Sequence, residues 1–221
     1  MILVCYLRCI FSDPGFIKNL KHQKNWKWCE TCKQTKPPRA YHCSNCRRCV
    51  FKMDHHCHYM NNCIGAKNLK FHLQFTGYMG LGSLYALSFL TFVFASKWKR
   101  QKELSRLNLG LGVLGILFSL VGFLLSTSVS IDIWTRVITN MTYIEKLKKL
   151  VGKQLSFGET ITRVFGTSSC FLPSTPDLRM NYFEETFQTK SEGQSYSVLI
   201  KLHLIGALNV LLAFLFGVSF N

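Results

Sequence analysis

The chain has 221 residues, of which 48% are apolar, and its 27 lysines and arginines against 11 acidic residues give a net charge of +16. This length allows one or two modest domains. A basic chain with zinc-type cysteines could read nucleic acid, but two uncharged apolar stretches and the absence of ββα finger spacing exclude that function. We expect the partners to be anionic lipid headgroups and a polyphosphate-bearing cofactor, with no nucleic acid.

Residues 1–28 are predicted to form a juxtamembrane segment. Residues 1–11 are apolar but too short to cross a bilayer, and they resemble the tail of a span. Asp13-Pro14-Gly15 predicts a turn. Lysines at three-residue intervals follow, which favours a basic linker near lipid headgroups.

A cysteine-rich module is predicted over residues 29–70. Between Cys29 and Cys63 the chain holds seven cysteines and four histidines, eleven possible metal ligands in 35 residues. Two closed zinc sites need four ligands each. A module this short rarely folds on an apolar core alone, so we expect small hairpins stabilised by metal.

The spacing of the first cysteines indicates how the ions are held. Cys29-x2-Cys32 and Cys43-x2-Cys46-x2-Cys49 each bring two thiolates to one ion, which free reduced thiols would not require. Because His42 adjoins Cys43, two interleaved sites are favoured over two consecutive ones.

At least one cysteine and two histidines are surplus to two zinc sites. The surplus falls around Asp54-His55-His56-Cys57. A cysteine beside a histidine and an aspartate on a metal-built scaffold is typical of a nucleophile with a base and an orienting carboxylate.

Residues 71–133 are predicted to form a transmembrane hairpin. Leu73–Ala95 and Leu107–Ile131 contain no charge over 23 and 25 residues, enough to cross a core of about 30 Å at about 1.5 Å per residue. The short loop between them predicts antiparallel helices, and small residues around Gly80 favour their close approach. Reduced thiols place the module in the cytosol, although five basic residues in that loop oppose this orientation.

The C-terminal part divides into residues 134–195, soluble in character and cytosolic, and the hydrophobic segment 196–221. Thr142–Lys149 predicts a short helix with Glu145 and Lys149 as an i,i+4 pair. Leu202–Asn221 is either a third span or, as we favour slightly, an interfacial helix.

The cysteine-rich segment resembles the DHHC protein S-acyltransferases. The resemblance covers residues 29–75 and rests on the string Cys-x2-Cys-x9-His-Cys-x2-Cys-x2-Cys-x4-Asp-His-His-Cys-x5-Cys, which ends in Asn-Asn-Cys-Ile-Gly. It extends weakly to residues 13–15, 142–145 and 164–166. It implies a membrane all-α fold, a transmembrane hairpin carrying a small cytosolic module with two zinc ions.

The resemblance also assigns each ligand. It implies a first zinc on Cys29, Cys32, His42 and Cys49, and a second zinc on Cys43, Cys46, His56 and Cys63. Cys57 is then the nucleophile, His55 its base and Asp54 the group that orients His55.

The implied activity is a two-step transfer of a long-chain acyl group, such as palmitoyl, from acyl-CoA to Cys57 and then to membrane-proximal cysteines of substrate proteins. The endoplasmic reticulum or Golgi is the implied location. The CoA phosphates are expected to meet basic residues, for which a solvated face near anionic lipid is an equal alternative: Arg39, Arg47, Arg48 and Lys52.

Three departures from the family pattern leave a second hypothesis open. His58-Tyr59 replaces the usual Pro-Trp after Cys57, and Tyr143 replaces the second threonine of Thr-Thr-x-Glu. The chain also carries only the tail of an expected N-terminal helical pair. It is therefore expected to be either an acyltransferase or a truncated, impaired form acting as a zinc-module membrane adaptor. A RING-like ligase is disfavoured because Cys-x-His-x2-Cys is absent.

Overall fold

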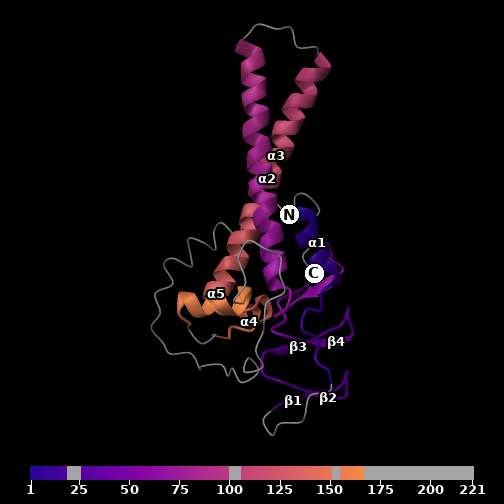
Figure 1. Cartoon of the computed structure of the whole chain (residues 1–221). Coiled ribbons are helices and arrows are strands. Elements are labelled where there is room, and N and C mark those ends of the chain that lie inside the picture. Colours follow the sequence, from indigo (N-terminus) through magenta and orange to yellow (C-terminus); the bar gives the residue numbers. More distant parts are fainter. Residues whose placement is uncertain (19–25, 100–105, 151–154, 167–221) are drawn as a thin grey trace. The chain divides into compact units, whose positions relative to one another are not determined.

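The computed structural model describes residues 1–18, 26–99, 106–150 and 155–166, which form two compact units (Figure 1). Among these residues, the first unit contains those up to Phe75 and those from Ile133 onward, and the second contains Thr76–Asp132. Segment 196–221 lies outside the described residues, so its position as a span or an interfacial helix stays a prediction.

The first unit contains three small antiparallel hairpins, as expected for a module built around metal. They are β1 (Lys27–Cys29) with β2 (Gln34–Lys36), β3 (Ala40–Cys43) with β4 (Arg48–Phe51), and β5 (His55–Cys57) with β6 (Asn62–Ile64). The register sets His42 opposite Cys49 and His56 opposite Cys63. Hairpins β3–β4 and β5–β6 thus each pair a histidine with a cysteine of the same predicted zinc site.

Helix α1 (Ile2–Phe11) is anchored to the third hairpin. Asn62 Nδ2 lies 3.0 Å, 3.1 Å and 2.9 Å from the carbonyl oxygens of Cys9, Ile10 and Ser12, which have no partner within the helix. The predicted turn follows, where Asp13 Oδ1 accepts hydrogen bonds from the next backbone amides at 2.8 Å. The helix end is therefore fixed beside the strand that follows Cys57.

Close backbone approach explains the glycine of Asn-Asn-Cys-Ile-Gly. A Cβ on Gly65 would lie 2.5 Å from the Pro14 carbonyl oxygen and 2.7 Å from Val50 Cγ1. The buried Asn68 fixes this turn, because its Oδ1 accepts from the Gly65 amide at 2.9 Å and its Nδ2 donates to the Cys63 carbonyl at 2.8 Å. The absence of a side chain at Gly65 therefore lets the end of hairpin β5–β6 pack against the turn at Pro14.

Two short helices close the first unit, α4 (Tyr143–Leu147) and α5 (Phe157–Phe165), each opened by a capping box. The predicted Glu145–Lys149 pair is wrong: α4 ends at Leu147, and the fully buried Glu145 pairs with Arg39 at 2.7 Å. At the end of α5, Phe165 stacks on Trp134 with ring centroids 6.0 Å apart.

The second unit consists of the apolar parts of α2 (Leu69–Lys99) and α3 (Arg106–Ile138) (Figure 1). Small residues lie between the helices, with Gly80 against Ser126 and Gly122 against Ser83. From the first pair to the second, the residue number rises along α2 and falls along α3, so the predicted antiparallel hairpin is confirmed. Residues 69–97 and 108–138 are long and apolar enough to cross a membrane, and Phe118 is 83% exposed.

Candidate active site

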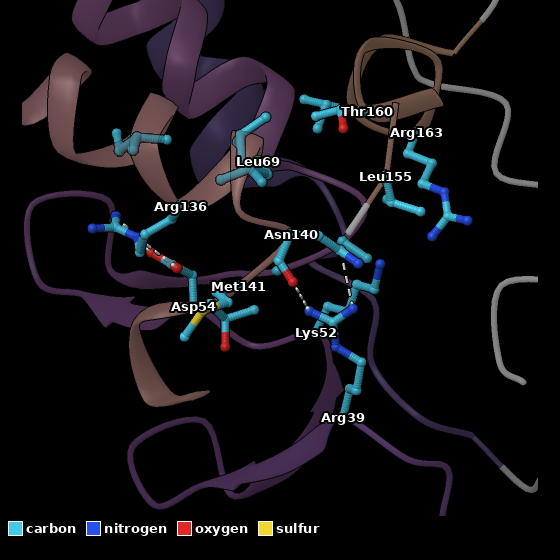
Figure 2. A pocket seen from close by; sticks show the side chains of 16 residues that line it. Arg39, Lys52, Asp54, Leu69, Arg136, Asn140, Met141, Leu155, Thr160 and Arg163 are labelled. Atoms are coloured by element: carbon cyan, nitrogen blue, oxygen red, sulfur yellow. Dashed lines mark hydrogen bonds and ion pairs between the residues drawn. The ribbon is translucent and has the colours of Figure 1, made fainter. Parts of the chain in front are cut away.

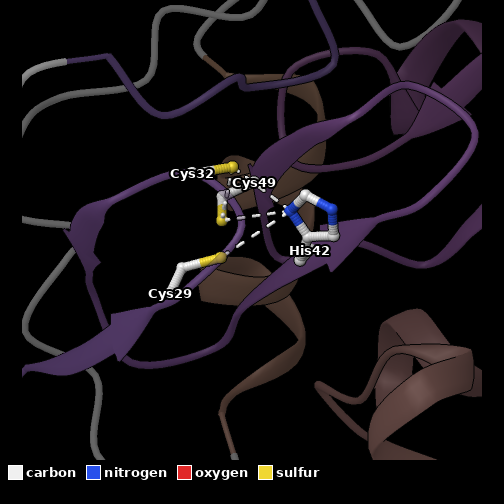
Figure 3. Close-up of side chains that lie close together, drawn as sticks. All are labelled: Cys29, Cys32, His42 and Cys49. Atoms are coloured by element: carbon white, nitrogen blue, oxygen red, sulfur yellow. Dashed lines mark hydrogen bonds between the residues drawn. The ribbon is translucent and has the colours of Figure 1, made fainter.

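The first zinc ligand set is gathered by the hairpins β1–β2 and β3–β4. Sulfur atoms of Cys29, Cys32 and Cys49 lie 3.7 Å, 3.2 Å and 3.9 Å from His42 Nδ1 (Figure 3). Tetrahedral bonds of about 2.3 Å to sulfur and about 2.1 Å to nitrogen put ligand atoms roughly 3.6–3.8 Å apart. The donor set and its spacing therefore fit a structural zinc ion.

The second set has a similar geometry and comes from β3, the turn between β3 and β4, β5 and β6. Sulfur atoms of Cys43, Cys46 and Cys63 lie 3.6 Å, 3.3 Å and 3.7 Å from His56 Nδ1. Each set thus holds three sulfurs and one nitrogen, the Cys₃His composition of closed structural sites. The interleaved arrangement predicted from the adjacent His42 and Cys43 is the one observed.

Cys57 belongs to neither ligand set. It ends strand β5, is 7% exposed and packs in an apolar cluster with Cys9, Met60, Ile64 and Phe71. Its sulfur lies within 4.8 Å of a ring nitrogen of His55. The structure thus leaves one thiol of the module beside a histidine and free of structural metal.

The His55 ring is oriented by Asp54. Their Nδ1 and Oδ2 atoms lie 2.9 Å apart, which leaves Nε2 as the ring nitrogen that Asp54 does not hold. Asp54 is itself held by Arg136 through two hydrogen bonds of 3.1 Å and by the Tyr143 amide, which donates to Oδ1 at 2.8 Å. The backbone of Tyr143 therefore supports Asp54, and this contact does not require a hydroxyl side chain at that position.

Charge and hydrogen bonding shift the pKa values of all three groups. Burial alone would raise the pKa of Asp54, but Arg136 and His55 hold it well below its usual range. Burial would lower the pKa of His55, yet the hydrogen bonds to Asp54 and Cys57 raise it to about 9. The pKa of Cys57 is lowered because the His55 hydrogen bond outweighs burial. Each of the last two shifts moves its group towards the charged form, imidazolium for His55 and thiolate for Cys57.

A second buried ion pair supports the segment that carries Tyr143. Arg39 donates to both carboxylate oxygens of Glu145, at 2.8 Å and 2.7 Å. It also donates to the Asn140 side chain at 3.1 Å and to the Asn140 carbonyl at 2.7 Å (Figure 2). This guanidinium ties the start of β3 to the turn between α3 and α4.

The four basic residues considered for the CoA phosphates occupy different environments. Arg39 is buried and bound to Glu145. Arg39 and Lys52 both line a pocket with a volume of about 60 Å³ (Figure 2). Burial, followed by the nearby Arg39 and Arg163, lowers the pKa of Lys52 to about 6. Arg47 and Arg48 are exposed at the opposite end of the β3–β4 hairpin. The structure brings together Arg39 and Lys52 alone of the four.

Two residues of the site were missed by the sequence analysis. Arg136 lies in the last turn of α3, and an arginine at the end of an apolar run was the available signal. His72 lies within the first turns of α2, and its ring centroid is 5.5 Å from that of His55. The sequence could have indicated His72 because it is an ionisable residue directly before an uncharged apolar stretch.

A family model for DHHC palmitoyltransferases matches residues 22–150, more than half of the chain. The Palmitoyltransferase ZDHHC3 proteins of Rattus norvegicus and Homo sapiens are each 36% identical to the chain over 167 residues. These matches cover 67% of the chain and 56% of each relative. Palmitoyltransferase ZDHHC7 of Rattus norvegicus is 31% identical over 217 residues, covering 90% of the chain and 70% of the relative.

Proposed function

Because the chain belongs to the DHHC palmitoyltransferase family, we propose that it transfers long-chain acyl groups from acyl-CoA to protein cysteines through an acyl-enzyme on Cys57. One observation carries the proposal. Two complete Cys₃His sets account for eight ligands, and Cys57 remains outside them with its sulfur within 4.8 Å of a ring nitrogen of His55. Two zinc ions in those sets would supply the scaffold and take no part in the reaction.

The first step forms the acyl-enzyme. The Cys57 thiolate attacks the thioester carbonyl carbon, the bond between that carbon and the CoA sulfur breaks, and the CoA thiolate takes the proton of the His55 imidazolium. In the second step a substrate cysteine gives its proton to His55 and attacks the Cys57 thioester. The acyl group moves to the new sulfur, and Cys57 leaves as a thiolate. Electrons and protons balance over the cycle.

The remaining groups act by positioning. Asp54 sets the tautomer and orientation of His55, while Arg136 and the Tyr143 amide keep the Asp54 carboxylate charged and fixed. Exchange of one thioester for another is nearly balanced in free energy, so positioning and charge stabilisation are the main requirements for the rate.

The four basic residues considered for the CoA phosphates differ in how accessible they are to an anion. Arg47 and Arg48 are exposed and available to anions, and Lys52 lines a pocket. Arg39 stays a candidate phosphate contact, although its guanidinium already binds Glu145 and Asn140. A phosphate near Lys52 would favour its charged form.

The chain is an integral membrane protein by its family and by the two membrane-capable helices found among its described residues. We further propose that the zinc module faces the cytosol, in the endoplasmic reticulum or Golgi, and acts on membrane-proximal cysteines of other proteins. Thiolate ligands require a reducing compartment, which supports this orientation.

Labelled palmitoyl-CoA tests the proposal. Purified protein in detergent is incubated with the label, and hydroxylamine-sensitive labelling and zinc content are measured. We expect Cys57→Ser to lose the label and keep about two zinc ions. Cys9→Ser is the matched control, since Cys9 is a buried thiol of the same cluster outside both ligand sets. An unlabelled wild-type protein with two zinc ions would instead favour a membrane adaptor.

A further inference from the structure

We propose that His55, Cys57 and His72 form a third divalent-metal site, which takes Zn²⁺ or Cd²⁺ and thereby blocks the Cys57 sulfur. Their donor atoms lie within 4.8 Å of one another. Two imidazole nitrogens and one sulfur are a donor set suited to these ions. Three protein ligands also match the number in open zinc sites, where water or another ligand fills the fourth position.

His72 provides an independent reason to expect a ligand here. The ring is buried, and its Nδ1 has no hydrogen-bond partner among the residues that the structure describes. Buried polar atoms normally find partners. A bond from this ring to a metal ion would supply a polar interaction that the surrounding side chains do not.

His55 is already arranged as a metal ligand would be. Its Nδ1 is held by Asp54 at 2.9 Å, and Asp54 is held in turn by Arg136. A carboxylate that fixes one ring nitrogen and so directs the other to the metal is the usual outer arrangement around zinc-bound histidines. As the metal–sulfur bond forms, the one proton shared by Cys57 and His55 leaves to solvent.

The neighbouring histidine does not take part in this cluster. His58 directly follows Cys57 in the sequence, but its ring packs against that of His56 with centroids 5.3 Å apart. His72 occupies the position beside Cys57 instead. The His55 side chain is 28% exposed, which gives an ion a route to the site.

The expected consequence is reversible inhibition. An ion at the third site would occupy the sulfur that forms the acyl-enzyme, a consequence that rests on the proposed function. The two structural sites each have four ligands and this site has three, so a moderate chelator should remove the third ion first.

Metal counting and thiol protection test the site without acyl transfer. The full chain, purified in detergent with its two structural zinc ions, is titrated with Cd²⁺ or Zn²⁺. Bound metal is counted, and alkylation of Cys57 by iodoacetamide is followed by mass spectrometry. We expect a third equivalent in the wild-type protein, with Cys57 alkylation slowed at least about tenfold by the loss of free thiolate.

Two His72 variants and a matched control decide the outcome. His72→Phe and His72→Gln should keep two ions, lose the third equivalent and leave Cys57 open to alkylation, whereas His58→Phe should bind the third ion as the wild type does. Two results would overturn the site: no third equivalent in the wild type, or an undiminished one in a His72 variant that retains two ions. Failure of acyl transfer in the wild type refutes the proposed function instead, and the metal count still decides the site.

Discussion

Arg136 and Asp54 are 82 residues apart in the chain, yet the guanidinium of one holds both carboxylate oxygens of the other at 3.1 Å. The contact joins the end of α3 to the strand that carries Cys57. Burial would otherwise favour a protonated Asp54, and Arg136 is the largest opposing influence on its pKa. The orientation of His55 therefore depends on a residue outside the cysteine-rich module.

Arg136→Met should slow acyl-enzyme formation by about 10²-fold, because a small misplacement of His55 relative to Cys57 carries a penalty of this size. Single-turnover labelling with palmitoyl-CoA measures the rate, and zinc content should stay at about two. Arg136→Lys, which keeps the charge but loses the paired hydrogen bonds, should be intermediate. A wild-type rate in Arg136→Met would remove Arg136 from the positioning chain.

Arg39→Met should destabilise the first unit by about 3–5 kcal/mol, because it leaves the carboxylate of Glu145 buried and unpaired. The double variant Arg39→Met/Glu145→Met should recover much of that loss, since the unpaired charge is removed as well. Thermal unfolding in detergent measures both. Additive losses in the double variant would mean that the two residues do not act as a pair.

Gly65→Ala should destabilise the module by about 1–3 kcal/mol, the usual cost of overpacking. The added Cβ would meet the Pro14 carbonyl at 2.5 Å, and a backbone atom cannot rotate away as a side chain can. Gly158→Ala is the control: a Cβ there meets nothing within 4 Å, and alanine suits helix α5. Equal melting temperatures for wild type and Gly65→Ala would contradict the packing argument.

Cys46→Ala should release the second zinc ion and unfold the β5–β6 hairpin, because metal affinity contributes directly to folding in small metal-built modules. Zinc content measured on purified protein should fall from about two to about one, with loss of Cys57 labelling. Cys9→Ala, outside both sets, should retain both ions. Two ions in Cys46→Ala would refute the ligand assignment.

Lys52→Met should stabilise the protein more at pH 6 than at pH 9. The folded protein holds this amine with a pKa of about 6, below the ordinary 10.5, so the unfolded chain binds more protons between these values. The contribution of Lys52 to stability therefore rises with pH across that range, and its removal helps most at the acid end. Melting temperatures relative to the wild type measure the difference. Lys33→Met, at a side chain 73% exposed, should change little.

Local spacing predicted two interleaved metal sites and a surplus thiol near Asp54 and His55, and the family resemblance assigned the individual ligands and the nucleophile. Zinc geometry restricts which cysteines share an ion, and hairpins bring the two thiolates of a Cys-x2-Cys motif onto one ion. The paired sets in the structure agree with this prediction, and so do the hairpins and the antiparallel apolar helices. The short helix after Asn140 was also predictable, because a capping box is a local pattern.

The sequence did not predict which residues far apart in the chain contact one another. The pairing of Glu145 looked local, with Lys149 one turn away, yet burial selected Arg39 from 106 residues earlier. Arg136 and His72 likewise lie beside Asp54 and Cys57 only because the ends of α2 and α3 fold against the module. The sequence alone determined that two interleaved metal sites and a surplus thiol were to be expected, because these follow from the number and spacing of ligands along the chain. Only the tertiary structure decided what surrounds that thiol, because desolvation and charge pairing depend on segments that meet after folding.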